Sequence, residues 1–202
     1  PNGISFAAYH ALYLITLPLF QSIMENLTDP NGFTTPPQFN QALLYLIPKK
    51  PSSTSEALGP AYTPGNTRPI SVVNTDNRIV ASILNSIIAP KAAQFCTSSQ
   101  RGFLYDRLLS SNVYDMDTAT RINSLTDPLG ALLLFDFSAA FPSVSHDYLW
   151  AILDHIGVPP HFLHAIKSLY TKNTHQLVLD NGLYPSFELK SGVRQGCPLS
   201  PT

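Results

Sequence analysis

A run of apolar residues that ends at a carboxylate constrains this chain more than any other stretch. Residues 131–135, ALLLF, lead directly into Asp136, and another apolar residue follows it. Such a run is long enough for a strand buried on both faces, although periodicity alone does not exclude a helix. A carboxylate ionised at the end of a buried strand costs several kcal/mol unless a cation meets it. No Lys or Arg lies between Arg121 and Lys167 to supply one locally, so we expect a strand over 131–137 and a cationic partner from elsewhere.

The composition is that of a globular protein with little net charge. The 202 residues are 44% hydrophobic and 12% charged, and the net charge is −1. This length suits one large domain or two small ones. A nucleic-acid-binding surface usually carries a basic excess, which is absent here. A nucleic-acid function must therefore rest on local residues or on parts of the protein outside this sequence.

The cysteines and the uncharged start of the chain bear on its compartment. Cys96 and Cys197 form neither a zinc-binding spacing nor a disulfide framework, which favours an intracellular location. Residues 1–24 carry no charged side chain, but they include a proline and lack the basic start of a signal peptide. We expect a buried helix there and no membrane partner. The lack of an initiating Met and the end at Thr202 are typical of a fragment.

The periodicity of the remaining sequence predicts a mixture of helices and strands, and hence an α/β (α+β) fold. Two hairpins are expected, one with the polar stretch 51–67 at its tip and one that turns at Asp180–Gly182. Ser145 should cap the start of a helix that stops at Gly157. The expected helices cover residues 4–27 with a break near Pro18, 78–95, about 108–122, 145–157 and 159–172. The expected strands cover residues 42–50, 68–73, 131–137, 174–179 and 184–189.

Four motifs follow one another along the chain: LIPKK…RPISVVNT, QRGF…R…NV, FDFSAAFPSVSHDYL and SGVRQGCPLSP. In this order and at roughly these separations they resemble the reverse transcriptase domain of non-LTR (LINE-type) retrotransposons. The resemblance implies part of a right-hand polymerase. Residues 1–129 would form the fingers with an N-terminal helical segment. Residues 130–202 would form the first part of the palm, with an incomplete palm sheet and no thumb.

The resemblance also supplies the cation for Asp136. In the family, the first Asp of the strand-to-helix motif binds two Mg²⁺ ions, and the backbone carbonyl of Phe137 would add a ligand. Two such ions, about 3.5–4 Å apart, stabilise the attacking and leaving oxygens of an in-line phosphoryl transfer, and Mg²⁺ prefers oxygen ligands. The family's second catalytic motif, an aromatic-Ala-Asp-Asp turn, is absent from the sequence. The metal site is therefore expected to be incomplete and the 202-residue chain inactive alone.

Three further residues are implied to contact the nucleotide. Phe141 lies five residues after Asp136, and an aromatic at this spacing in the family packs under the incoming sugar and excludes a 2′-hydroxyl. Gln195 and Gly196 would contact the incoming nucleotide and the templating base pair. Gly lets the backbone approach a ligand closely, and Gln offers both a donor and an acceptor. The alternative for Phe141 is an ordinary core residue.

Basic residues are implied to contact phosphates. Arg68, with Lys49 or Lys50, would bind the triphosphate through charge-assisted hydrogen bonds, although a solvated strand end explains the two lysines equally well. The residues implied to contact the template are Arg101, Arg107 and Arg194.

The implied function is RNA-directed DNA polymerisation, with an RNA template, a DNA primer and deoxynucleoside triphosphates as partners and a nuclear site of action. A group II intron-type reverse transcriptase would share most of the motifs. The alternative from a different class is a decayed or repurposed module that only binds nucleic acid or a protein. Two departures from the family pattern bear on this choice: Pro142 replaces an Asp found in many members, and the stretch 51–67 is longer than expected.

Two other arrangements of polar residues carry no expected chemistry. His161 and His164 share a predicted helix but lack further metal ligands at a fitting spacing, so they are interpreted as surface residues. Ser143 or Ser145, with His146 and Asp147, resembles a hydrolase triad compressed into one stretch, whereas triad members converge from separate parts of a fold.

Overall fold

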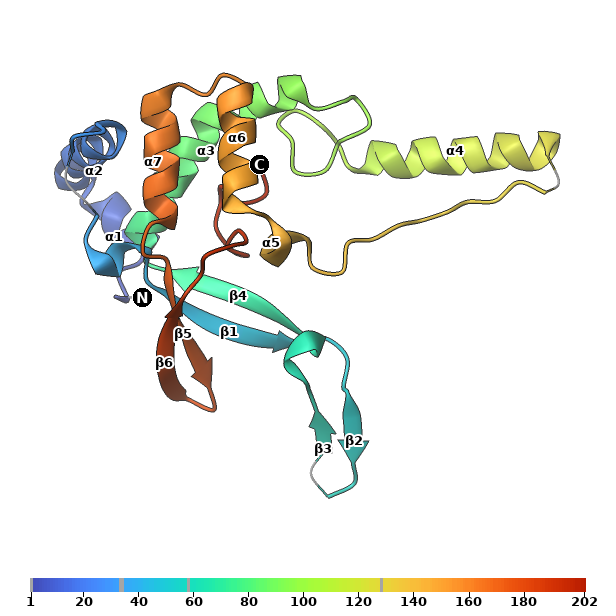
Figure 1. The fold of residues 1–202 in the computed structure, drawn as a ribbon, viewed down its shortest axis with the longest axis horizontal. Coiled ribbons are helices and arrows are strands. Elements are labelled where there is room, and N and C mark those ends of the chain that lie inside the picture. Colours follow the sequence, from blue (N-terminus) through green and yellow to red (C-terminus); the bar gives the residue numbers. More distant parts are fainter. Residues whose placement is uncertain (1, 33–34, 58, 128) are drawn as a thin grey trace.

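A mixed sheet with helices on one side forms the centre of the molecule (Figure 1). The computed structural model describes residues 2–32, 35–57, 59–127 and 129–202. The four strands lie in the order β4-β1-β5-β6. Their bounds are Ala42–Pro48 for β1, Thr67–Val73 for β4, Thr174–Leu179 for β5 and Gly182–Glu188 for β6. The expected α/β class is confirmed.

Both predicted hairpins are present in this sheet. Strands β1 and β4 pair antiparallel, from Ala42 opposite Val73 to Pro48 opposite Thr67. Strands β5 and β6 also pair antiparallel, whereas β1 and β5 run parallel and join the two hairpins. The β5–β6 turn has Asp180 at φ 49° and Asn181 at φ 60°. Two consecutive residues with positive φ are the requirement of a type I′ turn, which matches the right-handed twist of the flanking strands.

The tip of the first hairpin is more ordered than the expected polar loop. It contains a two-stranded ribbon of β2 (Ser53–Ser55) and β3 (Gly59–Ala61), followed by the 3₁₀ helix η2 (Pro64–Asn66). The ribbon projects away from the main sheet (Figure 1). Side chains at its base fix it, because the Ser52 hydroxyl accepts hydrogen bonds from the Thr63 N–H and from Asn66 Nδ2.

The hydrophobic core lies between helices. Its main contributors are α2 (Tyr13–Thr28), α3 (Thr75–Phe95) and α7 (Pro160–Tyr170), which bury Leu84 and Leu169 completely. Helix α3 presents its apolar residues at helical spacing, so one stripe faces this core. The other buried core residues are Phe20, Leu27, Val80, Ala81, Ile88, Ala92, Ala165, Ile166, Tyr170 and Cys197.

The N-terminal helix differs from the prediction in both its break and its burial. The break falls at Leu12, between α1 (Phe6–Ala11) and α2, and Pro18 lies inside α2. The Thr16 hydroxyl donates to the Tyr9 carbonyl across this break and satisfies an acceptor that the end of α1 leaves free. The side chains around Leu12–Leu19 are mostly exposed, so the expected burial is wrong for this stretch, whereas Phe20 and Leu27 further along α2 lie in the core. None of the helices in the described ranges has the length and hydropathy needed to cross a membrane.

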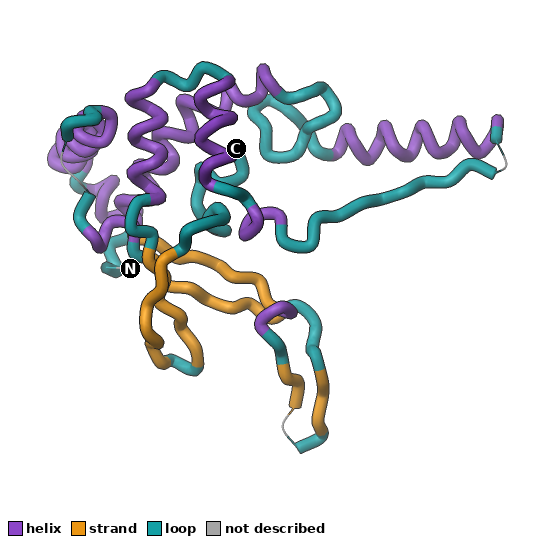
Figure 2. Tube along the Cα trace, in the orientation of Figure 1, coloured by secondary structure: helices purple, strands orange, loops and turns teal. Residues whose placement is uncertain are grey.

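The predicted strand over residues 131–137 is also wrong. Helix α4 (Ser110–Thr126) projects from the body, and the chain returns along it as an extended loop (Figure 2). No strand in the described part of the chain pairs with residues 131–137. The side chains of Leu134 and Phe135 are 75% and 92% exposed. An apolar run forms a buried strand only where a neighbouring strand and a covering layer exist, and the sheet offers neither to this stretch.

Local signals after this stretch predicted the structure well. A short helix α5 (Ala140–Ser143) is followed by α6 (His146–His155), and the Ser145 hydroxyl accepts from the Tyr148 N–H as the predicted cap. Gly157 has φ +78°, a left-handed conformation that ends the helix. The predicted proline start of α7 is confirmed, with Pro160 as its first residue.

Candidate functional site

Two of the residues implied to bind the nucleotide line one pocket. The pocket has a volume of about 280 Å³ and lies between β1, β4, the start of α5 and the segment that follows β6. Phe141 and Gln195 line it together with Pro69 and Ser71 of β4. Phe141 and Gln195 are far apart in the sequence, so the fold brings them together.

Backbone hydrogen bonds fix the two walls of this pocket to each other. The Gly192 N–H donates to the Val144 carbonyl at 2.7 Å, and the Val193 N–H donates to the Phe141 carbonyl at 2.9 Å. Gly192 has φ +81°, and a Cβ there would lie 2.9 Å from both Cα and O of Pro142. Only glycine allows this conformation and this approach. Gly192 was not among the predicted site residues, although a glycine two residues before the RQG tripeptide was a usable signal.

A histidine completes the same junction. His146 Nε2 lies 2.8 Å from the Gly192 carbonyl oxygen, and because a carbonyl only accepts, Nε2 carries the proton. The His146 ring also packs against aromatic rings, with centroids 5.1 Å from Tyr170 and 5.8 Å from Trp150. His146 was expected to carry no chemistry, as part of the compressed triad. The structure gives it a contact with the pocket wall instead.

The loop that carries Gln195 and Gly196 rests on β4. The Ser71 N–H donates to the Gln195 carbonyl at 2.9 Å. Gly196 has φ +110°, and a Cβ there would lie 3.0 Å from the Ser71 carbonyl oxygen. This glycine was expected to allow a close approach to a ligand. The close approach in the structure is to the backbone of β4.

Behind this loop lies a buried histidine. His175 is fully buried, and its Nε2 lies 2.9 Å from the Ser71 hydroxyl. Burial and the nearby Arg194 guanidinium lower the pKa of His175 to about 4. The His175 ring is therefore neutral at neutral pH. Strand β5, strand β4 and the Gln195 loop thus share one buried polar contact region.

The structure places Arg194 in the interior, which differs from the expected template contact. Arg194 is 1% exposed, and its Nη2 donates to the Leu169 carbonyl at 3.2 Å. The guanidinium carbon lies 5.8 Å from the centre of the Tyr170 ring. Its Nε and Nη1 have no hydrogen-bond partner among the described residues. Arg194 therefore anchors the loop to α7 and does not face a surface along which a template could run.

Arg107 also has structural contacts within the chain, and its template contact stays a prediction. Its guanidinium donates to four backbone carbonyls around the end of α3, those of Ala93, Cys96, Thr97 and Gln100. The last carbonyls of a helix lack helical partners and carry partial negative charge, so a cation there is favourable. Arg107 acts as a cap for α3.

Arg101 is paired with a carboxylate. Its Nη1 lies 2.5 Å from Asp115 Oδ2, and the two side chains are 25% and 66% exposed. This pair attaches the QRGF segment to the first half of α4. Asp115 is mostly exposed, so this ion pair does not prevent Arg101 from contacting a template. The template contact of Arg101 stays a prediction.

The residues expected at the triphosphate lie at the far end of the β1–β4 hairpin. Lys49, Lys50 and Arg68 are all exposed. Arg68 precedes Pro69 on β4, and side chains alternate between the two faces of a strand. The alternation places Arg68 on the face opposite to Pro69 and Ser71, which line the pocket. The structure does not bring Arg68 into the pocket, and its triphosphate contact stays a prediction.

Asp136 lies outside the pocket on the extended loop. It is exposed, and the part of the chain that the structure describes contains no group of three or more His, Cys, Asp or Glu side chains that could hold a metal ion. The Asp136 carboxylate and the Phe137 carbonyl are oxygen donors of the kind that Mg²⁺ prefers. They are too few to form a two-ion site, so the described residues do not fit a complete metal centre.

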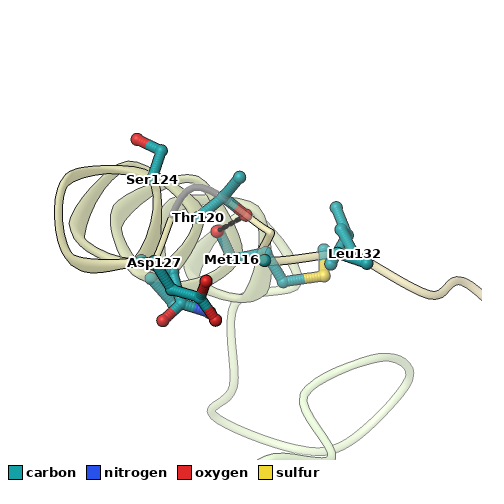
Figure 3. Close-up of a pocket in the computed structure, with 9 residues that line it drawn as sticks. Met116, Thr120, Ser124, Asp127 and Leu132 are labelled. Atoms are coloured by element: carbon teal, nitrogen blue, oxygen red, sulfur yellow. Dashed lines mark hydrogen bonds between the residues drawn. The ribbon is translucent and has the colours of Figure 1, made fainter.

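A second hollow lies beside the loop that leads to Asp136. It has a volume of about 290 Å³ and lies between α4 and residues 130–132 (Figure 3). Met116, Thr120 and Leu132 line it, and the Thr120 hydroxyl donates to the Met116 carbonyl at 2.7 Å. Asp136 does not line this hollow. This hollow therefore adds no ligand to the expected metal site.

Comparison with known proteins places the chain among retroelement sequences. Residues 47–202 match the family described as "Reverse transcriptase (RNA-dependent DNA polymerase)". The chain is 29% identical over 160 residues to the "Transposon TX1 uncharacterized 149 kDa protein" of Xenopus laevis. The aligned residues cover 79% of this chain and 12% of that protein. It is 32% identical over 145 residues to the "Retrovirus-related Pol polyprotein from type-2 retrotransposable element R2DM" of Drosophila melanogaster, covering 70% of this chain and 13% of that protein. The chain thus spans a small part of the length of these curated relatives.

Proposed function

The chain belongs to the reverse transcriptase (RNA-dependent DNA polymerase) family of non-LTR retrotransposons, and from this premise we propose that it forms the nucleotide-binding end of an RNA-directed DNA polymerase. In the proposed reaction, a primer 3′-hydroxyl attacks the α-phosphate of a deoxynucleoside triphosphate and pyrophosphate leaves. The observation that supports this role is the shared pocket of Phe141 and Gln195. The proposed partners are an RNA template and a DNA primer, and the proposed site of action is the nucleus.

The residues of the pocket have distinct proposed roles. The Phe141 ring would pack under the sugar, where an aromatic face excludes a 2′-hydroxyl by size. The Gln195 side chain would hydrogen-bond the nucleotide through its amide, which both donates and accepts. Arg68, with Lys49 or Lys50, would bind the triphosphate, provided that the hairpin end moves toward the pocket when the nucleotide binds.

Asp136 and the Phe137 carbonyl are proposed as two ligands of a divalent cation. A bound cation of this kind would stabilise negative charge on the reacting phosphate oxygens. The described residues contain no group of three or more His, Cys, Asp or Glu side chains that would complete the site. We therefore propose that the 202-residue chain binds Mg²⁺ weakly and does not polymerise by itself.

The proposed division into fingers (1–129) and palm (130–202) cuts through one sheet. Strands β1 and β4 lie before residue 130 and β5 and β6 after it, yet β1 pairs directly with β5. The two parts would therefore move as one body at this junction. Any relative motion would involve the outer end of the β1–β4 hairpin with its β2–β3 ribbon, and α4.

Primer extension tests the proposed function. The protein expressed from the complete reading frame that contains these residues should extend a DNA primer on an RNA template in the presence of Mg²⁺. Asp136→Ala should reduce extension to background, and Phe141→Ala should raise ribonucleotide incorporation relative to deoxynucleotide incorporation. The 202-residue chain alone should give no extension.

Two outcomes would contradict the proposal. Extension by the complete protein that survives Asp136→Ala would remove Asp136 from the reaction. Extension by the 202-residue chain that is lost in Asp136→Ala would show that the described residues suffice. A different result, binding of primer–template without any extension, would favour the alternative of a non-catalytic binding module. The exposed and isolated position of Asp136 also favours that alternative.

A further inference from the structure

We propose that His146 is a positioning residue that sets sugar selectivity: through the Gly192 carbonyl, it holds the backbone of Phe141 in place under the incoming nucleotide. This inference rests on the proposed function and adds a residue to it. Nothing in the resemblance assigned a role to His146 or to Gly192.

Three hydrogen bonds join the Phe141 turn to the Gly192 segment. Two are between backbone groups, from Gly192 N–H to the Val144 carbonyl at 2.7 Å and from Val193 N–H to the Phe141 carbonyl at 2.9 Å. The third comes from a side chain, His146 Nε2, to the Gly192 carbonyl at 2.8 Å. The peptide groups on both sides of Gly192 are thus bonded to the stretch 141–146. His146 is the only side chain among these contacts.

The donor on His146 is itself rigidly placed. His146 is the first residue of α6, directly after the capping residue Ser145. Its ring packs against Trp150 and Tyr170, and Tyr170 is 8% exposed. A donor whose rotamer is fixed by packing can hold its acceptor within a narrow range. His146 therefore fixes the Gly192 carbonyl with respect to α6 and α7.

Phe141 depends on this junction because its own helix is short. Helix α5 has only 4 residues and no side-chain cap at its start. The described chain just before it is an extended, exposed loop. Gly192 packs so closely against Pro142 that even a Cβ at Gly192 would lie 2.9 Å from it. The position of the Phe141 ring therefore depends on the position of the Gly192 segment.

A steric filter is sensitive to small displacements. A misplacement of about 1 Å in a reacting or binding group can change a rate by roughly 100-fold. Rejection of a 2′-hydroxyl by Phe141 requires that the ring cannot retreat. Removal of the His146 hydrogen bond should let the Gly192 segment shift, and the Phe141 ring would shift with it. Ribonucleotides would then be incorporated more readily.

The test is the ratio of kcat/KM for a deoxynucleotide over the matching ribonucleotide, measured on the complete protein that contains these residues. His146→Phe keeps an aromatic ring but removes the donor, and it should lower this ratio roughly tenfold, the effect of one lost hydrogen bond. His146→Gln keeps a donor and should restore most of the ratio. His155→Phe, at the exposed end of the same helix, is the matched control and should leave the ratio unchanged. Since both rates come from one preparation, partial unfolding cancels in the ratio.

A double variant tests whether His146 acts through Phe141. Phe141→Ala removes the filter, so adding His146→Phe to it should lower the ratio no further. If His146→Phe does not yield folded protein, His146→Met, which also packs against aromatic rings but has no donor, replaces it.

The outcomes separate the inference from the proposed function. An unchanged ratio in an active His146→Phe variant, or a further loss in the double variant, would overturn the inference and leave the polymerase proposal intact. No extension by the unsubstituted protein would overturn the proposed function and the inference together.

Discussion

At the scale of single residues, the surroundings of an arginine decided its role more than its sequence motif did. Arg107 and Arg194 were both expected to contact a template. Arg107 instead donates to carbonyls at the end of α3, and Arg194 is buried against Leu169 and Tyr170. A guanidinium has five donors in a fixed plane, so a group of free carbonyls can accept its hydrogen bonds, as a phosphate can. The same motif therefore fits either role.

Arg107→Gln should lower the free energy of unfolding by about 2 kcal/mol, because several helix-end carbonyls lose a charged donor. Urea unfolding monitored by circular dichroism measures this change. The matched control is Arg121→Gln, since Arg121 is 77% exposed and pairs with Asp117 one helical turn away. That change should cost less than about 0.5 kcal/mol. Equal losses in both variants would show that Arg107 does not cap α3.

At the scale of elements, burial separated two apolar stretches that look alike in sequence. Residues 131–137 are rich in Leu and Phe, and the core stripe of α3 consists mainly of Val, Ala, Leu and Ile. Only α3 packs against other helices, while residues 131–137 face solvent. Helical periodicity tells which side of an element can be buried, but it does not tell whether a partner is present.

Two Leu→Ala substitutions test this difference. Leu84 in α3 is fully buried, so Leu84→Ala should lower the free energy of unfolding by about 3 kcal/mol through lost burial and the cavity that remains. Leu134 is 75% exposed, so Leu134→Ala should change the same quantity by less than about 0.5 kcal/mol. A large loss in Leu134→Ala would mean that residues 131–137 are buried after all.

At the scale of the whole molecule, one buried histidine links stability to pH. His175 connects β5 to β4 beneath the Gln195 loop, and its pKa is lowered to about 4 by burial and by Arg194. Between about pH 6.5 and pH 4 the unfolded chain binds a proton that the folded chain does not. Folding is therefore favoured above pH 6.5 and loses stability as the pH falls through this window.

The loss from His175 should reach about 3 kcal/mol by pH 4, because each unit of pKa shift corresponds to about 1.4 kcal/mol. Unfolding free energies at a series of pH values measure it. His175→Gln removes the titration and should flatten the curve between pH 6.5 and 4 relative to the unsubstituted protein. His161→Gln changes an exposed histidine and should leave the slope as it was. Parallel curves for all three proteins would contradict the neutral, buried ring.

Local chemistry in the sequence was enough to predict most elements and their ends. The cap at Ser145, the stop at Gly157 and the tight turn at Asp180–Gly182 depend on a few neighbouring residues. The convergence of Phe141 and Gln195 came from the family resemblance, since no periodic pattern relates two residues so far apart. The structure places both residues at one pocket, and their contacts with a nucleotide stay predictions.

The tertiary structure alone decided which residues of the motifs face the pocket and which hold it together. The family, the mixed class and most local elements could be predicted from the sequence, because they follow from short-range preferences and from the order of motifs. The roles of Gly192, His146, Arg107 and Arg194 depend on carbonyls and rings contributed by distant parts of the chain. The exposure of residues 131–137 depends in the same way on the lack of a pairing strand among the described residues. Hydrogen bonds and burial require a partner, and the position of that partner is fixed only when the chain has folded.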